Sequence, residues 1–238
     1  MQIIYHTTVT SGLRAVAHLA RASPYATTIT APIAKAEEIA SKQVARYPSL
    51  GADHGTRTAL RQVGLPALQM VVLPPDGGKI AIVLLANQPP DDREQWQLAI
   101  DPDWPLIWRN YQLAQTELGA ITWRLSEQAR THYRQRINRL ITGRGGQPTP
   151  GQRPYQLPAD TARKQVLALA EHLTHYPGFS GIRNDVFAFA QHSTRVWRAT
   201  HPDEPAPMWP TMPYVRFGKP RTASLRELTG EDINDEKI

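Results

Sequence analysis

Apolar residues recur at helical spacing along one long stretch of the chain, from Ile107 to Arg144. Successive members lie three or four positions apart: Ile107, Tyr111, Ala114, Leu118, Ile121, Leu125, Ala129, Tyr133 and Ile137. Spacing of this kind places one apolar face along a helix. The pattern therefore predicts a single long amphipathic helix, with Asp103 as its N-cap and Pro105 in its first turn.

A β-hairpin is the second clear pattern. Two apolar runs, residues 68–73 and 79–86, flank the turn sequence PPDGG. Proline and glycine at these places suit a tight reversal of the backbone. The second run is almost wholly apolar, which predicts a strand at the centre of a sheet.

Shorter patterns predict further elements in the N-terminal half. β-branched and aromatic residues predict a strand at 2–10 and another at 96–100. Helical spacing follows at 13–22 and at 34–47. The remaining two segments are expected to be a threonine-rich connection and a polar stretch: residues 24–32 and 51–64.

The C-terminal third predicts a helical hairpin. Helical spacing runs over 160–175 and 184–200, and a proline-rich segment at 202–220 is expected to wrap the body as an extended strap. The two helices also have the outline of a helix-turn-helix, with a polar side that could enter a major groove: Arg183, Asn184, Gln191, His192, Arg195 and Arg198. The alternative is an ordinary helical hairpin that packs an apolar side into a core: Val186, Phe187, Phe189, Ala190 and Trp197.

Glycine and proline mark a boundary near the middle of the chain. They are frequent over residues 143–158, which predicts a linker. We therefore expect an α+β domain over 1–142 that ends in the long basic helix, a helical region with its strap over 159–220, and an acidic tail over 221–238.

The charge is unevenly distributed along the chain. The 238 residues have a net charge of +6, but residues 227–238 hold five acids and one lysine, so this end carries −4 and the rest carries +10. A basic body of this kind suits a nucleic-acid binder. The hydrophobic content of 41% and the six tryptophans favour a folded protein over a disordered one.

Much of the excess charge lies on the second half of the predicted long helix. Glu127 is the only acid there, and one or two salt bridges along the helix would leave most of the charge free. An arginine can pair two phosphate oxygens at once, and arginines one turn apart can each take one phosphate. The alternative is a solvated basic face. The predicted nucleic-acid-binding residues are Arg124, Arg130, Arg134, Arg136, Arg139 and Arg144.

Candidate catalytic residues lie near the N-terminal end. Cleavage of RNA through the ribose 2′-OH needs a base, an acid and cations for the phosphate. His6 on the first predicted strand, and Arg14 and His18 on the first predicted helix, could supply these groups. For each histidine the alternative is an ordinary, partly exposed side chain.

The sequence lacks the residues that several classes of functional site require. The chain has no cysteine, which excludes disulfides, thiol catalysis and thiolate zinc sites. His172 and His175 are three residues apart, but no acid completes a zinc pattern, so we expect no metal and no cofactor. The motifs GxxxxGK[ST], GxSxG and HExxH are absent. Neither a signal-peptide layout nor an apolar run of membrane-span length is present, so we expect a cytoplasmic protein with no membrane partner.

The order of the N-terminal elements resembles that of a known family. The strand at 2–10, the helix at 13–22 and the hairpin within 68–86 follow the start of a ferredoxin-like βαββαβ domain, as in the repeat-associated RNA-binding (RAMP) superfamily of CRISPR systems. With the arginine-rich helix at 124–144, the chain resembles the crRNA-processing endonucleases of type IV CRISPR systems. The resemblance implies metal-independent cleavage of repeat RNA and retention of the product.

We therefore expect an α+β fold, with a ferredoxin-like sheet, a long arginine-rich helix and a C-terminal helical hairpin. The expected function is RNA binding, and its enzymatic form is a metal-independent repeat-RNA endonuclease. Other subunits of a ribonucleoprotein complex would be further partners. Two alternatives stay open: a non-enzymatic DNA-binding accessory protein of a plasmid or mobile element, and a structural subunit whose basic helix docks an acidic protein.

Overall fold

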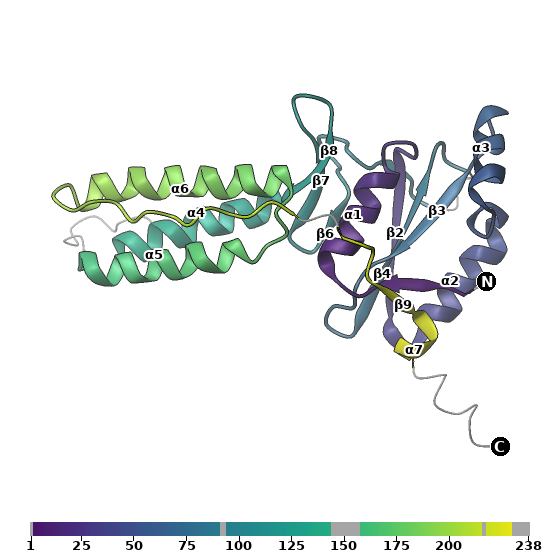
Figure 1. The fold of residues 1–238 in the computed structure, drawn as a ribbon, viewed down its shortest axis with the longest axis horizontal. Coiled ribbons are helices and arrows are strands. Elements are labelled where there is room, and N and C mark those ends of the chain that lie inside the picture. Colours follow the sequence, from purple (N-terminus) through teal and green to yellow (C-terminus); the bar gives the residue numbers. More distant parts are fainter. Residues whose placement is uncertain (1, 91–93, 144–157, 216–217, 230–238) are drawn as a thin grey trace, which may run out of the picture. The chain divides into compact units, whose positions relative to one another are not determined.

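The computed structural model describes residues 2–90, 94–143, 158–215 and 218–229 (Figure 1). Its helices and antiparallel strand pairs make it an α+β protein, as the sequence predicts. In this part of the chain, no helix combines the length and the apolar character that crossing a membrane requires.

The chain forms two compact units. The first comprises the described residues of Met1–Leu106, Leu113–Ile121 and Phe217–Ile238. The second comprises those of Ile107–Gln112 and Thr122–Arg216. Each unit carries one group of the residues singled out from the sequence.

A four-stranded sheet with the order β3-β4-β2-β5 forms the centre of the first unit. Its strands are β2 (Tyr25–Pro32), β3 (Leu68–Val72), β4 (Lys79–Ala86) and β5 (Gln97–Leu98). β4 lies between β3 and β2 and is buried from its second residue onward, which confirms the predicted central strand. Gly77 and Gly78 in the connecting turn have φ angles of 53° and 77°, in the region that glycine tolerates.

A two-stranded antiparallel pair brings the N-terminal and C-terminal segments together. β1 (Ile4–His6) pairs with β9 (Thr222–Ser224). The predicted first strand is shorter than expected because the Thr8 hydroxyl caps α1 and starts that helix at Val9. The helical segments of this unit are α1 (Val9–Leu19), η1 (Ile33–Lys35), α2 (Ala36–Arg46), η2 (Pro48–Leu50), α3 (His54–Gln62) and α7 (Leu225–Thr229).

Two elements of this unit differ from the sequence prediction. The expected threonine-rich connection is strand β2, which pairs with β4 along its whole length, and threonine favours this pleated geometry. The expected polar stretch contains α3, whose N-cap Asp53 accepts a hydrogen bond from the Thr56 backbone N at 2.7 Å. None of the α3 residues is buried, so the sequence has no apolar face there from which the helix could be predicted.

The predicted long helix is wrong in its first half. These residues form β6 (Ile107–Trp108), β7 (Tyr111–Gln115) and β8 (Ile121–Leu125), in the order β6-β7-β8. Within β8, the step of four from Ile121 to Leu125 puts both side chains on one face of a strand as readily as on one face of a helix. Gly119, at φ 81°, lies in the reversal before β8, where its N–H donates to the Thr116 carbonyl at 2.9 Å.

Only the second half is helical, as α4 (Glu127–Thr142). The Ser126 hydroxyl caps it by accepting from the Ala129 backbone N at 3.3 Å, so the predicted cap at Asp103 is wrong. Gly143, at φ 73°, ends the helix. The apolar stripe is buried as the spacing requires: Ala129, Tyr133, Ile137 and Ile141.

In the second unit, α4 packs against α5 (Ala159–Thr174) and α6 (Ser180–Thr200) (Figure 1). The predicted helical hairpin is confirmed by α5 and α6. Leu169 and Leu173 of α5, with Phe189 and Trp197 of α6, are almost fully buried. Phe187 is an exception, because it is exposed rather than part of the core.

Residues 202–215 run along the bundle without helix or strand, as the strap prediction requires (Figure 1). The Val215 backbone N donates to the Gly178 carbonyl at 3.1 Å, and Trp197 Nε1 donates to the Glu204 carbonyl at 3.0 Å. The strap therefore runs antiparallel to α6. A Cβ at Gly178 would lie 2.0 Å from the Pro213 carbonyl oxygen, so the close approach needs glycine there.

The two units divide the chain at places other than the predicted domain bounds. α4 belongs with α5 and α6 because its buried stripe packs on them. β9 and α7, which fall within the predicted acidic tail, belong to the first unit. Apart from Gly143 and Pro158, the predicted linker lies outside the described residues, and so do residues 230–238 of the predicted tail.

Candidate nucleic-acid interface and catalytic cluster

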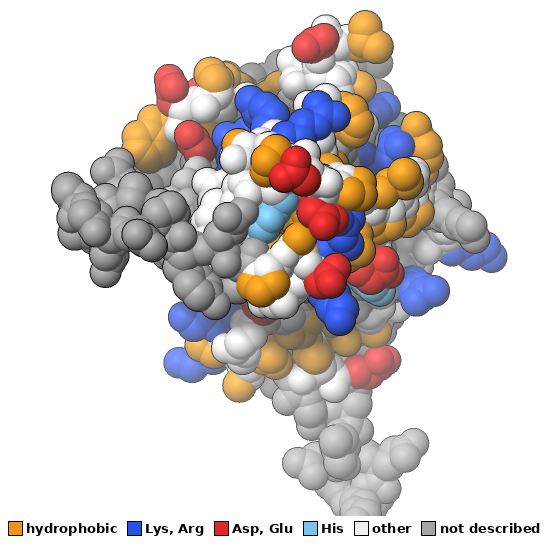
Figure 2. All heavy atoms as spheres, turned by 90° about the vertical axis from the view of Figure 1, so that its left-hand side faces the viewer, with side chains coloured by type: hydrophobic (Ala, Val, Ile, Leu, Met, Phe, Trp, Pro, Cys, Tyr) orange, Lys and Arg blue, Asp and Glu red, His pale blue; other side chains and the backbone are white. Residues whose placement is uncertain are grey.

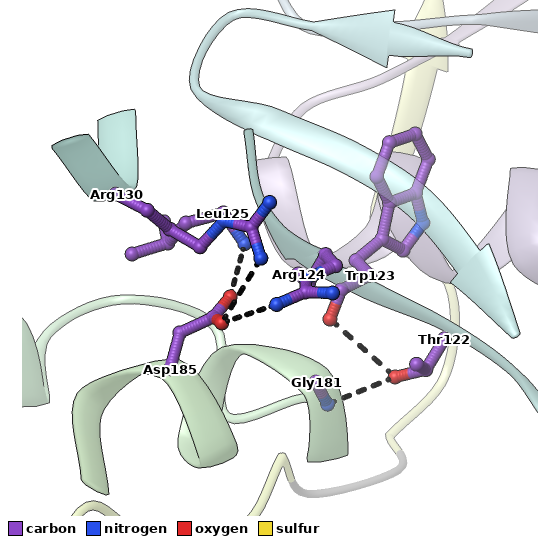
Figure 3. Close-up of polar contacts among 7 residues, drawn as sticks. All are labelled: Thr122, Trp123, Arg124, Leu125, Arg130, Gly181 and Asp185. Carbon is purple, nitrogen blue, oxygen red and sulfur yellow. Dashed lines mark hydrogen bonds and ion pairs between the residues drawn. The ribbon is translucent and has the colours of Figure 1, made fainter. Parts of the chain in front are cut away.

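A buried carboxylate joins the beginnings of α4 and α6 to β8. The Asp185 side chain is 6% exposed and accepts from Arg124 Nη2 at 2.9 Å and from the Leu125 backbone N at 2.8 Å (Figure 3). Arg130 Nη1 lies 3.9 Å from the same carboxylate. A buried charge is stable only with such partners, so these contacts hold the three elements together.

A second contact fixes the first turn of α6 on β8. Thr122 Oγ1 accepts from the Ser180 hydroxyl at 2.9 Å. It also accepts from the Gly181 backbone N at 3.3 Å (Figure 3). A Cβ at Gly181 would lie 2.6 Å from the Trp123 carbonyl oxygen. The glycine therefore lets α6 begin close enough for Asp185 to reach Arg124.

α4 and α6 run side by side in the same direction. Asp185 meets Arg130 near the beginning of both helices, and further along His192 Nε2 donates to Asn138 Oδ1 at 2.7 Å. Burial, then Arg195 and Arg134, lowers the pKa of His192. His192 therefore lies at the seam between α4, which carries Arg134, and α6, which carries Arg195.

We call Arg124, Arg130, Arg134, His192 and Arg195 the basic face. Arg130 and Arg134 are four residues apart, so they share the edge of α4 that lies along α6. Burial, then the neighbouring Arg124, lowers the pKa of Arg130, and Asp185 opposes this effect. Among the residues that the structure describes, the ion pairs of this face all go to Asp185. A positive charge therefore remains along the seam.

The structure separates the other predicted binding residues from this face. Arg136 and Arg139 lie on another side of α4 together with His132, because steps of four and three residues align these side chains. All are exposed. Arg144 lies outside the described residues.

The sequence reasoning missed Asp185 as a countercharge. It lies 61 residues from Arg124 along the chain, and no local pattern links the two. It is also the only acid between Ser180 and Thr200, and it is buried. The exposed side of α6 therefore carries neutral and cationic side chains alone: Asn184, Phe187, Gln191, Arg195 and Arg198.

Charge is mixed at the end of the bundle where α6 finishes. Figure 2 looks onto the left-hand end of Figure 1 and shows acidic side chains next to lysine and arginine side chains. In this part of the bundle Arg163 Nη2 lies 3.4 Å from Glu204, and its guanidinium carbon lies 5.0 Å from the Trp197 ring centroid. At this end of the bundle Arg163 therefore has an acidic partner.

Tyrosine hydroxyls lie inside the second unit. Tyr133 Oη and Tyr176 Oη are 2.6 Å apart, and the Tyr111 ring centroid is 5.9 Å from that of Tyr176. Burial raises the pKa of both Tyr111 and Tyr133. These rings therefore stay neutral and hold α4 to β7 and to the α5–α6 turn.

The candidate catalytic residues lie in the first unit. His6 Nδ1 is 2.8 Å from Ser11 Oγ, which accepts from the Arg221 backbone N at 3.0 Å. Arg14 Nη1 donates to the Gly218 carbonyl at 2.6 Å. His6 and Arg14 thus contact one C-terminal segment, residues 218–224, which the sequence reasoning did not connect with them.

The two candidate histidines differ in their surroundings. Burial lowers the pKa of His6, so its imidazole is neutral at pH 7 and can accept a proton. His18 is exposed and takes no part in the hydrogen bonds of His6, Ser11 and Arg14. Ser11, which orients His6, could have been found from its place three residues after the Thr8 cap.

Among the described residues, no group of three or more histidines and acids is placed to hold a metal ion. His172 packs against Tyr176 with ring centroids 5.7 Å apart, and His175 Nδ1 lies 3.0 Å from the Glu171 carbonyl oxygen.

Comparisons with protein-family models, with curated proteins and with solved structures gave no match.

Proposed function

We propose that this chain is an RNA-binding protein that holds a structured repeat hairpin on its basic face. The observation that carries the proposal is the seam between α4 and α6, where His192 Nε2 donates to Asn138 Oδ1 at 2.7 Å and where Arg134 and Arg195 are both exposed. Asp185, the acid of α6, is already engaged by Arg124 and Arg130. The remaining cations need a polyanion, and arginine binds phosphate oxygens through its planar fork.

A duplex RNA stem suits the geometry of this surface. Cations one turn apart on α4 are matched by cations on α6, which forms two rows rather than one. Contacts of this kind go to phosphates and fix position without reading sequence, as is usual for double-stranded RNA. Other subunits of a ribonucleoprotein complex would supply any sequence reading that the face lacks.

We extend the proposal to metal-independent cleavage of the bound RNA. In this reaction the ribose 2′-oxygen loses its proton to a base and attacks the adjacent phosphorus. The bond from phosphorus to the 5′-oxygen breaks, and that oxygen takes up a proton, which leaves a 2′,3′-cyclic phosphate and a 5′-hydroxyl. A neutral His6 oriented by Ser11 supports the role of base, and Arg14 would stabilise the charge on the phosphate.

The resemblance to the type IV crRNA-processing endonucleases supports the same proposal, with a ferredoxin-like sheet as part of it. In a ferredoxin-like domain the first and last strands are neighbours, and here β1 pairs with β9, although in a two-stranded sheet separate from β3-β4-β2-β5. The product would stay bound because its phosphates remain on the basic face after the chain is cut.

Salt-dependent binding tests the RNA-binding proposal. Fluorescence anisotropy with a labelled hairpin RNA gives the slope of log Kd against log salt. The double variant Arg134→Ala, Arg195→Ala should lower affinity and reduce this slope by about 2, because each phosphate contact contributes roughly one counterion. Lys42→Ala with Lys164→Ala removes the same charge elsewhere and should leave the slope nearly unchanged. An unchanged slope in the arginine variant would overturn the proposal.

Duplex DNA is the second candidate ligand. The exposure of Arg195 and Arg198 on α6 favours it, because a helix with exposed cations can enter a major groove. Tighter binding to duplex DNA than to hairpin RNA at equal salt, lost in Arg195→Ala with Arg198→Ala, would establish this function in place of RNA binding.

Cleavage is tested with repeat RNA in EDTA. The wild-type protein should release a 2′,3′-cyclic phosphate, and His6→Ala should slow this step by about 100-fold or more with little change in Kd. His18→Ala is the matched control and should keep the wild-type rate. Full activity in His6→Ala would remove His6 from the mechanism, and an inactive wild-type protein would limit the function to binding.

A further inference from the structure

α6 exposes an aromatic ring in the middle of its cationic side. Phe187 is 65% exposed, whereas its neighbours Val186 and Phe189 are buried and fill the inward side of the helix. Leaving a phenylalanine in water forgoes the favourable free energy of burying its ring. The fold therefore leaves this ring available at a place where a polar residue would be expected.

A second exposed ring lies on the strap beside the same helix. Tyr214 is 73% exposed, and the Arg183 guanidinium carbon lies 3.3 Å from its ring centroid. Arg183 Nε also donates to the Met212 carbonyl at 3.3 Å, which holds the guanidinium between the strap backbone and the ring. One face of Tyr214 is thus covered by a cation, and its high exposure leaves the other face open.

The two rings lie along the same edge of α6. Arg183 and Phe187 are one helical turn apart, so they point to the same side. The close approach of the strap at Gly178, where Val215 donates to the Gly178 carbonyl at 3.1 Å, fixes the position of Tyr214. The rings are therefore presented from two segments that are bonded to each other.

The charge around the rings favours one kind of occupant. The exposed side of α6 continues from Phe187 through Gln191 to Arg195 and Arg198 and carries no acid. Single-stranded nucleic acids bind where cations follow the backbone and aromatic rings stack on the bases. A second copy of the chain would instead bring Arg195 and Arg198 against the same cations, and like charges repel.

We propose that Phe187 and Tyr214 form a stacking site for unpaired nucleotides that flank the duplex on the basic face. The proposal rests on the proposed function, because it needs an RNA held along α4 and α6. Each ring takes one base on its open face. Arg183 positions the Tyr214 ring, and Arg195 is placed to bind the phosphates of the same strand.

Binding of two RNAs separates the contribution of this stacking site from that of the basic face. One is a blunt hairpin, and the other is the same hairpin with a single-stranded flank that carries 2-aminopurine. Phe187→Ala and Tyr214→Ala should each weaken binding of the flanked hairpin about tenfold and leave binding of the blunt hairpin unchanged. The wild-type protein should quench the 2-aminopurine fluorescence, and the double variant should not.

The control variants keep either the fold or the ring. Met208→Ala removes a side chain on the same strap that is 88% exposed but not aromatic, and it should change neither affinity. Phe187→Tyr and Tyr214→Phe keep a ring and should retain both the affinity and the quenching.

Five outcomes would overturn the stacking site, and they differ in whether the basic face and the proposed function survive. Equal wild-type affinity for the two RNAs, or quenching that survives in the double variant, removes this site and leaves the basic face in place. Loss of both affinities together with a lower Tm would show that the rings are structural. A dimer mass by light scattering that Phe187→Ala abolishes would assign the ring to self-association. No binding of either RNA by the wild-type protein would remove the proposed function as well.

Discussion

Arg130 and Arg134 lie one turn apart on α4, yet their surroundings differ. The Arg130 side chain is 20% exposed and lies beside the buried Asp185, whereas Arg134 is exposed and lies one turn before Asn138, which accepts from His192. The cations near Asp185 stabilise the junction of β8, α4 and α6. Further along, Arg134 and Arg195 have no acidic partner among the ion pairs of the described residues. The number of arginines on a helix therefore says less about binding than the place where the fold puts its acid.

The largest expected effect comes from removing that acid. Asp185→Ala should lower the free energy of unfolding by about 3–5 kcal/mol, because it leaves Arg124 and Arg130 together without a countercharge and the Leu125 N–H without its acceptor. Asp185→Asn should cost less, since its amide oxygen can still accept from Leu125. Urea unfolding followed by circular dichroism measures both. A loss below about 1 kcal/mol for the alanine variant would contradict the structural role of this junction.

A smaller loss is expected where α6 approaches β8. Gly181→Ala should lower the free energy of unfolding by about 1–3 kcal/mol, because its Cβ would lie 2.6 Å from the Trp123 carbonyl oxygen. Gly218→Ala is the matched control, since its Cβ would meet nothing within 4 Å. Equal stabilities of the two variants in the same urea experiment would mean that the junction tolerates a wider spacing.

The pH dependence of His192 sharpens the comparison further. Burial, with Arg195 and Arg134, holds the pKa of His192 below its ordinary value of about 6.5. The unfolded chain then binds the proton more tightly, so the stability associated with neutral His192 is present above pH 6.5 or so and is lost as the pH falls through the folded pKa.

Bound RNA should raise this pKa, because phosphate charge offsets the two guanidinium groups. Titration of the His192 ring by NMR, with and without hairpin RNA, measures the change. Arg134→Ala should also raise the pKa of His192 in the protein without RNA. A His192 pKa that RNA does not move would place the ligand away from the seam.

The smallest expected effect on stability comes from removing the exposed Arg134 side chain. Arg134→Ala should change the free energy of unfolding by no more than about 0.5 kcal/mol, as is usual for exposed positions. Arg124→Ala should cost more, about 1.5–3 kcal/mol, because it removes a hydrogen bond to a buried charge. If thermal unfolding ranked the two variants the other way, the division between paired and free cations would be wrong.

Some elements could be predicted because the spacing of their apolar residues fits only one kind of secondary structure. The turn glycines at 77 and 78 and the apolar run of β4 specify a hairpin, and the stripes of α5 and α6 are long enough to specify helices. The pair Ile121 and Leu125 allowed two interpretations, since residues four apart share a face in a strand as well as in a helix. Pairing within a sheet, which sequence spacing does not contain, selected the strands.

The candidate sites divide in the same way. The sequence indicated His6, Arg14 and the arginines of α4, because residue type alone limits which side chains can bind phosphate or move a proton. It did not indicate that residues 218–224 lie against His6 and Arg14, or that Phe187 faces outward. Both depend on contacts between segments far apart in the chain.

By itself, the sequence determined the α+β class, the β3–β4 hairpin, the helical hairpin and the basic character of α4. These follow from spacing and composition, which neighbouring residues fix among themselves. Only the tertiary structure decided that β7 and β8 are strands, that Asp185 pairs with Arg124, and that His192 of α6 bonds to Asn138 of α4. Burial and electrostatic interaction depend on distance in space, and folding brings together residues that the sequence places 61 positions apart.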